Sequence, residues 1–134
     1  MSGPVLGLAE IVLWTHDVDA ALAFYRDLFG LEVISPPGLP NRFLSTGEVS
    51  GGVPAMIVLV PHPEGGRFPA AKKERVLHHL AFKVAPARYE ELRERCAAAG
   101  LEVRGGIHPV LEGVRTFYVD DPMGNEVEVI SPEP

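Results

Sequence analysis

The tetrapeptide Gly30-Leu31-Glu32-Val33 returns 70 residues later as Gly100-Leu101-Glu102-Val103, and this repeat decides the fold. An internal repeat marks a structural unit that is used more than once, so the sequences around the two copies have to agree as well. A helical pattern precedes each copy, and a strand-like run precedes each helical pattern. The sequence therefore predicts one unit used twice.

The first copy lies at the end of a predicted amphipathic helix. Asp17 is a good N-cap residue for this helix, and Gly30 suits the position just after its C-terminus. A strand over 8–15 is predicted before the helix, and three more strands are predicted after it, over 31–34, 42–46 and 55–60. The apolar face of the helix consists of Val18, Leu22, Tyr25 and Phe29.

The second copy follows the same plan. Pro86 suits the first helical position, and Gly100 the position after the helix. The predicted strands are 77–84, 101–104, 114–119 and 126–130, and the apolar helix face consists of Tyr89, Leu92, Cys96 and Ala99.

The fold class is therefore α+β, with two tandem βαβββ modules that form a curved mixed sheet. The modules span 8–60 and 77–132 within a single domain, 1–134, and 61–76 is the linker between them. The linker charges Lys72, Lys73 and Arg75 are expected to be solvated.

Composition excludes several classes of protein. With 46% apolar residues the chain is not a disordered one, and a net charge of −6 without a basic run argues against nucleic acid as a partner. The chain has no apolar run of about 18 residues, so no membrane partner is expected either, and the expected compartment is the cytoplasm. Cys96 is the single cysteine, which excludes an intrachain disulfide, and we expect it to be an inert core thiol.

Alternation along the strands gathers polar residues on one face. Side chains in a strand point alternately to its two faces, and the more apolar set should lie under the helix. The other face then carries Glu10, His79 and Glu128, one from each of three strands. His78 has the opposite parity from His79 and is expected to point toward the helix layer. The same alternation places Val12, Trp14 and Ala81 on the polar face, as an apolar wall for an organic substrate.

Two interpretations of this polar face remain open. Carboxylates that face inward are costly unless they are paired or bound to a cation, so a metal site would explain them. Side chains from neighbouring strands are close enough to converge on one ion. Alternatively, Glu10 and Glu128 are solvated in a wide trough, and His79 hydrogen-bonds one of them.

Several motifs resemble the vicinal oxygen chelate superfamily. They are the duplicated unit itself, Leu28-Phe29-Gly30-Leu31, His78-His79-Leu80-Ala81-Phe82, and the run from Tyr118 through Asp121-Pro122-Met123-Gly124-Asn125 to Glu128. The resemblance covers about residues 8–132 and implies the glyoxalase-like fold. The superfamily includes glyoxalases, bleomycin-resistance proteins, fosfomycin-resistance enzymes, epimerases and extradiol dioxygenases, so the fold does not fix the reaction.

The resemblance also implies a set of metal ligands. His79 and Glu128 match the ligand positions of the second module, and Glu10 lies where relatives most often carry His. The fourth position holds Val58, which cannot bind a metal. Two carboxylates and one imidazole favour Fe²⁺ or Mn²⁺, with Zn²⁺ or Ni²⁺ as the alternatives.

Two further residues resemble the active site of extradiol dioxygenases. Tyr118, ten residues before Glu128, corresponds to a tyrosine that would hydrogen-bond a substrate oxygen. His108, ten residues earlier, is similar to a loop histidine that would move a proton or stabilise charge. The alternatives are a tyrosine that only lines the barrel and a histidine that only belongs to a surface loop.

The leading hypothesis is a small metal-dependent enzyme that binds a substrate with vicinal oxygens, with an extradiol-dioxygenase-like oxidoreductase as the best specific case. A glyoxalase-like lyase or isomerase is the second hypothesis. The third is a ligand-sequestering protein of the bleomycin-resistance type, for which an acidic chain suits a cationic drug. A homodimer is expected, because pairing would cover the apolar sheet edges.

Overall fold

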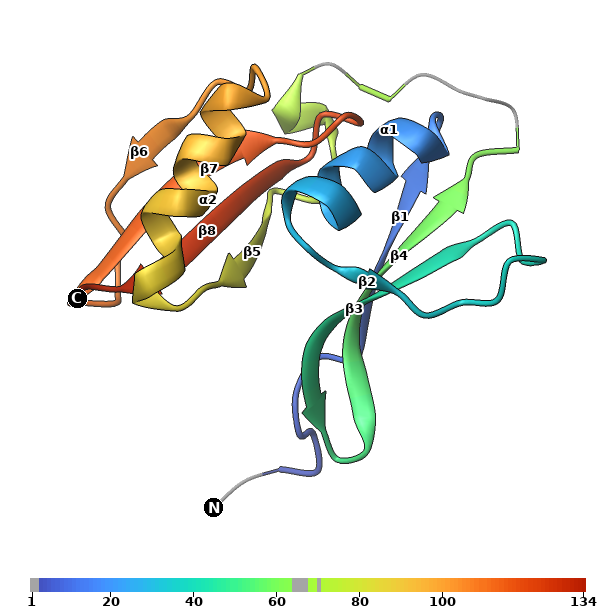
Figure 1. The fold of residues 1–134 in the computed structure, drawn as a ribbon, viewed down its shortest axis with the longest axis horizontal. Coiled ribbons are helices and arrows are strands. Elements are labelled where there is room, and N and C mark those ends of the chain that lie inside the picture. Colours follow the sequence, from blue (N-terminus) through green and yellow to red (C-terminus); the bar gives the residue numbers. More distant parts are fainter. Residues whose placement is uncertain (1–2, 64–67, 70) are drawn as a thin grey trace. The chain divides into compact units, whose positions relative to one another are not determined.

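The computed structural model describes residues 3–63, 68–69 and 71–134. The chain divides into two compact units, residues 1–67 and 68–134, and each contains a four-stranded mixed sheet with a helix (Figure 1). Within each unit the elements follow the order βαβββ, so the predicted fold class is confirmed. Residues 64–67 and 70 of the predicted linker 61–76 lie outside the described residues.

The first sheet has the strand order β1-β4-β3-β2. β1 pairs in parallel with β4, while β4 with β3 and β3 with β2 pair antiparallel. The strands are β1 (Glu10–Thr15), β2 (Glu32–Val33), β3 (Arg42–Ser50) and β4 (Val53–Pro61).

The helix of the first unit begins as predicted but widens at its end. The Asp17 side chain caps α1 (Val18–Leu22) by accepting the backbone N–H of Ala20 at 3.0 Å, and Gly30 follows the helix with φ +79°. Between them the chain forms a π-helical segment, η1 (Ala23–Leu28). Phe24 and Tyr25 of this segment are both buried.

The second unit repeats this topology. Its sheet has the order β5-β8-β7-β6, with β5 parallel to β8 and the other pairs antiparallel. Pro86 begins the helix, and Gly100 follows it with φ +86°. The elements are η2 (Lys72–Glu74), β5 (Leu80–Lys83), α2 (Pro86–Ala98), β6 (Arg104–Gly106), β7 (Val114–Asp120) and β8 (Glu126–Pro132).

The strand that we predicted over 77–84 is shorter in the structure. β5 begins at Leu80, which pairs with Val127, and β8 itself begins one residue earlier at Glu126. Because β8 emerges from a hairpin turn at that point, residues before Leu80 have little strand to pair with. His78 and His79 therefore precede the strand, and this matters for the site.

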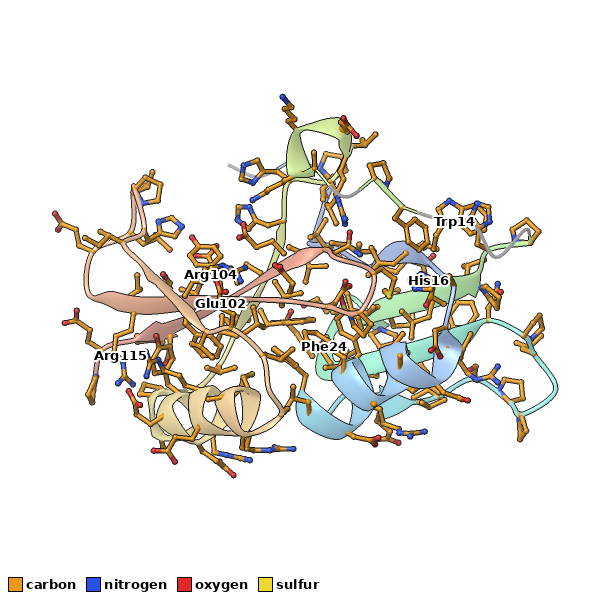
Figure 2. All side chains as sticks on the ribbon, turned by 90° about the horizontal axis from the view of Figure 1, so that it is seen from above. Trp14, His16, Phe24, Glu102, Arg104 and Arg115 are labelled. Carbon is orange, nitrogen blue, oxygen red and sulfur yellow. The ribbon has the colours of Figure 1, made fainter. Side chains whose placement is uncertain are left out.

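The core of the second unit lies between its sheet and α2. Phe117 of β7 is fully buried and meets the ring of Tyr89 edge to face, with centroids 5.4 Å apart. Arg115 lies over the same ring at 4.2 Å, on the side of the sheet that α2 covers (Figure 2). Cys96 is fully buried on the inner face of α2, as predicted. The opposite face of this sheet is left for polar groups.

None of the helices in the described part of the chain combines the length and the apolar character that a membrane span requires.

Candidate metal centre

The face of the second sheet away from α2 carries the predicted polar residues. Glu128 pairs with Tyr118 on one side and with Ala81 on the other, so these three side chains share a face. His79, two residues before Ala81, reaches the same carboxylate. The structure thus brings together His79, Tyr118 and Glu128, three of the residues singled out in the sequence.

Glu128 is the centre of this group. Its side chain is only 4% exposed, Oε1 lies 3.1 Å from Nε2 of His79, and Oε2 accepts the hydroxyl of Tyr118 at 3.0 Å. The rings of His79 and Tyr118 meet at a steep angle, with centroids 6.0 Å apart. A buried carboxylate is costly without a counter-charge, and the two groups that bond Glu128 here are an imidazole and a phenol. An additional cation would compensate this charge.

Tyr118 is held in its protonated form. Burial and the neighbouring Glu128 carboxylate both raise the pKa of the Tyr118 hydroxyl above its usual value near 10. The hydroxyl is therefore a hydrogen-bond donor at neutral pH.

A second carboxylate, Glu126, lies close by but is already paired with cations. Lys72 contacts its Oε1, and Arg104 donates to its Oε2 at 3.2 Å. Burial opposes the charge of Glu126, but the two cations outweigh it and lower the pKa. Arg104 also bonds Asp120 at 2.7 Å (Figure 2 labels Arg104). Lys72 is thus ion-paired, which corrects the expectation that it is simply solvated.

His78, His79 and Glu126 form a cluster that could hold a metal ion, since one ligand atom from each lies within 4.8 Å of the others. The charges distinguish Glu126 from Glu128. Both oxygens of Glu126 face cations, whereas the oxygens of Glu128 face His79 and Tyr118. Of the two carboxylates, Glu126 is therefore the one whose charge is already compensated by cations.

The expectation for His78 is wrong. His78 is exposed, and its Nδ1 lies 2.8 Å from Nδ1 of His79. The strand alternation does not apply, because both histidines precede β5. His78 is thus a member of the site that parity reasoning missed, although its adjacency to His79 was visible in the sequence.

The run from Asp121 to Asn125 builds the hairpin between β7 and β8. The buried Asp121 carboxylate accepts the backbone N–H groups of Met123 and Asn125 at 2.9 and 2.8 Å, and the Asn125 amide at 3.0 Å. Gly124 adopts φ +84°, and Arg75 donates to the carbonyl of Met123 at 3.0 Å. Arg75 is therefore a turn contact and not a solvated charge. This motif fixes where β8 begins, and so where Glu126 and Glu128 lie.

His108 contacts its own loop. Its Nδ1 accepts the backbone N–H groups of Val110 at 3.2 Å and Leu111 at 2.9 Å, which leaves the ring proton on Nε2. His108 thus forms hydrogen bonds within its own loop, and its catalytic role stays a prediction.

The remaining predicted residues lie in the first unit, on β1. Glu10, Val12 and Trp14 are exposed, while the alternate residues Leu13 and Thr15 are buried, as strand parity predicts. Val12 pairs with Val58, just as Ala81 pairs with Glu128 in the second unit. Val58 thus occupies the position in the first sheet that corresponds to Glu128. The metal-binding role of Glu10 and the substrate-binding roles of Val12, Trp14 and Ala81 stay predictions.

The duplicated βαβββ unit agrees with a comparison of the whole sequence with known protein families. The chain is a member of the Glyoxalase/Bleomycin resistance protein/Dioxygenase superfamily, whose model matches residues 7–129. This confirms the resemblance that the motifs indicated. Proteins of this superfamily bind small molecules.

Solved structures share the fold along nearly the whole chain. A glyoxalase/dioxygenase from Nostoc punctiforme has a TM-score of 0.76 at 19% identity, with all of both chains covered. A lactoylglutathione lyase from Agrobacterium tumefaciens has a TM-score of 0.64 at 29% identity, with 96% of each chain covered. The fosfomycin resistance protein FosX from Listeria monocytogenes has a TM-score of 0.67 at 22% identity, covering 95% of this chain and 93% of its own. No curated protein matches this sequence.

Proposed function

We propose that this protein is a metal-dependent enzyme that binds a small molecule through two neighbouring oxygens at a divalent cation held by His79 and Glu128. The observation that carries the proposal is the 3.1 Å between Nε2 of His79 and Oε1 of Glu128. Two adjacent ligands of an octahedral ion, each about 2.1 Å from the metal, lie about 3.0 Å apart. The pair therefore has the spacing of two metal ligands as it stands.

The donor types narrow the metal. An imidazole nitrogen with a carboxylate oxygen suits Fe²⁺ or Mn²⁺, and Zn²⁺ or Ni²⁺ are the alternatives. Glu10, predicted from the sequence as a third ligand, would add a second carboxylate and strengthen the preference for Fe²⁺ or Mn²⁺. With three protein ligands, further positions stay open for the substrate.

Within this class, the reaction that we propose first is extradiol-type cleavage of a catechol-like ring by dioxygen. The bound metal would supply Lewis acidity and a site for the ionised substrate. Tyr118 is protonated at neutral pH and donates to Glu128 in this structure; with Glu128 bound to a metal, the hydroxyl would instead donate to a substrate oxygen and orient it. His108, with its proton on Nε2, is a hydrogen-bond donor and could serve the substrate from its loop.

An oxygen electrode tests this reaction. Protein loaded with Fe²⁺ should consume oxygen when a catechol is added, and Tyr118→Phe should lower kcat by about 10- to 100-fold, the value of a hydrogen bond to a charged group. Tyr89→Phe is the matched control, because Tyr89 lies on the α2 side of the sheet. Absence of oxygen uptake with a panel of catechols would remove the dioxygenase reaction.

A glyoxalase-like lyase or isomerase is the second candidate. It is supported by the 29% identity with the lactoylglutathione lyase from Agrobacterium tumefaciens. In this reaction a carboxylate of the site, Glu128 or Glu10, would act as the base. Turnover of a hemithioacetal without oxygen consumption would favour it over ring cleavage.

The third candidate is a ligand-sequestering protein, supported by the exposed Trp14, which is 52% accessible and meets His62 edge to face at 5.0 Å. Trp14 is the only tryptophan in the chain, so its fluorescence reports ligand binding nearby. Quenching by a cationic aromatic drug in metal-free protein, together with failure to bind any of the four metals, would favour this candidate.

A homodimer is also part of the proposal. The hairpin between β3 and β4 extends beyond the rest of the first sheet (Figure 1), and Val49 and Val53 on it are 62% and 48% exposed. An interface with a second copy of the chain would cover these exposed apolar side chains. Light scattering should give twice the chain mass, and Val49→Lys with Val53→Lys should give the monomer.

A further inference from the structure

The two adjacent histidines before β5 form a direct ring-to-ring contact. Nδ1 of His78 lies 2.8 Å from Nδ1 of His79, and the rings are inclined at 67° with centroids 5.0 Å apart. Two nitrogens at this distance share one proton in a hydrogen bond, so one ring donates and the other accepts.

The carboxylate of Glu128 determines the direction of that bond. An ionised carboxylate only accepts, so His79 donates through Nε2–H to Oε1 of Glu128 at 3.1 Å. A neutral imidazole carries one proton, which leaves Nδ1 of His79 as an acceptor. His78 must then donate through Nδ1–H. The protons run from His78 to His79 to Glu128, and Tyr118 donates to the other carboxylate oxygen.

We propose that His78 is a positioning residue for His79, which it holds through the Nδ1–Nδ1 hydrogen bond so that Nε2 faces Glu128. This inference rests on the proposed metal site and names the group that orients one of its ligands. Metal-bound histidines generally use their second ring nitrogen for an orienting hydrogen bond. Here the partner is another histidine, which can donate or accept at the same atom.

That ability distinguishes His78 from a carboxylate or a carbonyl in the same place. In the metal-free protein His79 needs a donor at Nδ1, because its proton is on Nε2. When Nε2 binds a metal, the proton of His79 is on Nδ1, and the partner must accept. His78 meets both requirements by changing its tautomer, so the His79 ring keeps its orientation in both states. The charge of the neighbouring Glu126 carboxylate is already matched by Lys72 and Arg104.

Three substitutions of His78 test this with the full chain. Asn places a carboxamide atom at the position of Nδ1, Gln places one at the position of Nε2, and Phe keeps the ring shape without nitrogen. We expect His78→Asn to bind Mn²⁺ about as tightly as the wild type. His78→Gln and His78→Phe should bind it about 10- to 100-fold more weakly, the loss typical of removing such a partner. Equal Mn²⁺ affinity in His78→Phe and wild type would overturn the inference.

A second measurement needs no metal. Nitrogen NMR of the metal-free protein in mildly alkaline buffer, where imidazoles are neutral, reports which nitrogen carries the proton. We expect His78 to carry its proton on Nδ1, and to lose this preference in His79→Phe. A His78 proton on Nε2 in the metal-free wild type would contradict the inference. If the wild type binds no Mn²⁺ at all, the proposed function fails, and the NMR result still decides the role of His78.

Discussion

The hydroxyl of Tyr118 donates a 3.0 Å hydrogen bond to Oε2 of Glu128, the residue directly opposite it on the neighbouring strand. The bond depends on a glycine on the other side of Tyr118. A Cβ added to Gly106 would lie 2.6 Å from Cε1 of the Tyr118 ring and 3.1 Å from the Thr116 hydroxyl. The missing side chain of Gly106 therefore gives the tyrosine ring the room from which its hydroxyl reaches Glu128.

Gly106→Ala should displace the Tyr118 ring and destabilise the protein by about 1–3 kcal/mol, as overpacking does. Gly105→Ala is the matched control, because a Cβ there meets nothing within 4 Å and neither glycine has positive φ. Urea denaturation of both variants measures the difference. In a Tyr118→Ala background most of the effect of Gly106→Ala should disappear, leaving only the closer contact with the Thr116 hydroxyl, and persistence of the full loss there would show that Tyr118 is not the residue that clashes.

Asp121→Ala should destabilise the hairpin that precedes β8. The substitution removes a buried carboxylate that accepts three hydrogen bonds, and two backbone N–H groups lose their acceptor. We therefore expect the free energy of unfolding to fall by about 2–4 kcal/mol. Asp120→Ala removes an exposed ion pair with Arg104 and should cost about 1 kcal/mol or less. The free energy of unfolding in urea checks both values, and similar losses for the two variants would contradict a special role of Asp121.

Cys96 should be unreactive in the native protein. Burial raises the pKa of its thiol to about 11, and the side chain is fully buried. Because the thiolate is the reactive form and the pKa is raised, the folded protein keeps the thiol protonated through neutral and mildly alkaline pH. Iodoacetamide should label it at pH 8 only after unfolding in urea. Rapid labelling of the native protein at that pH would show that α2 does not bury the thiol.

The helical and topological parts of the fold follow from the sequence. The glycines after both helices, the Asp17 cap and the alternation of β1 are local signals, and local signals are what a sequence carries best. The start of β5 could not be predicted in the same way. It depends on where β8 begins, and that is set by the hairpin at Asp121 on a distant segment.

The candidate site could likewise be predicted only in part. Parity and motif placed Glu128 and Tyr118 correctly, because both lie within regular strands. The ion pairs of Glu126 with Lys72 and Arg104 were missed, since they join residues 54 and 22 positions apart in the sequence. The role of His78 was missed because alternation was applied to a residue outside the strand.

The most direct test of the metal site compares two neighbouring carboxylates. Wild type, His79→Ala, Glu128→Gln and Glu126→Gln would each be freed of metal, titrated with Fe²⁺ or Mn²⁺ and assayed by elemental analysis after gel filtration. We predict about one metal per chain in the wild type and in Glu126→Gln, and loss of the metal in His79→Ala and Glu128→Gln, with all four proteins folded. Metal retained in Glu128→Gln but lost in Glu126→Gln would contradict the assignment of Glu128, and a wild type that takes up neither metal would contradict the site itself.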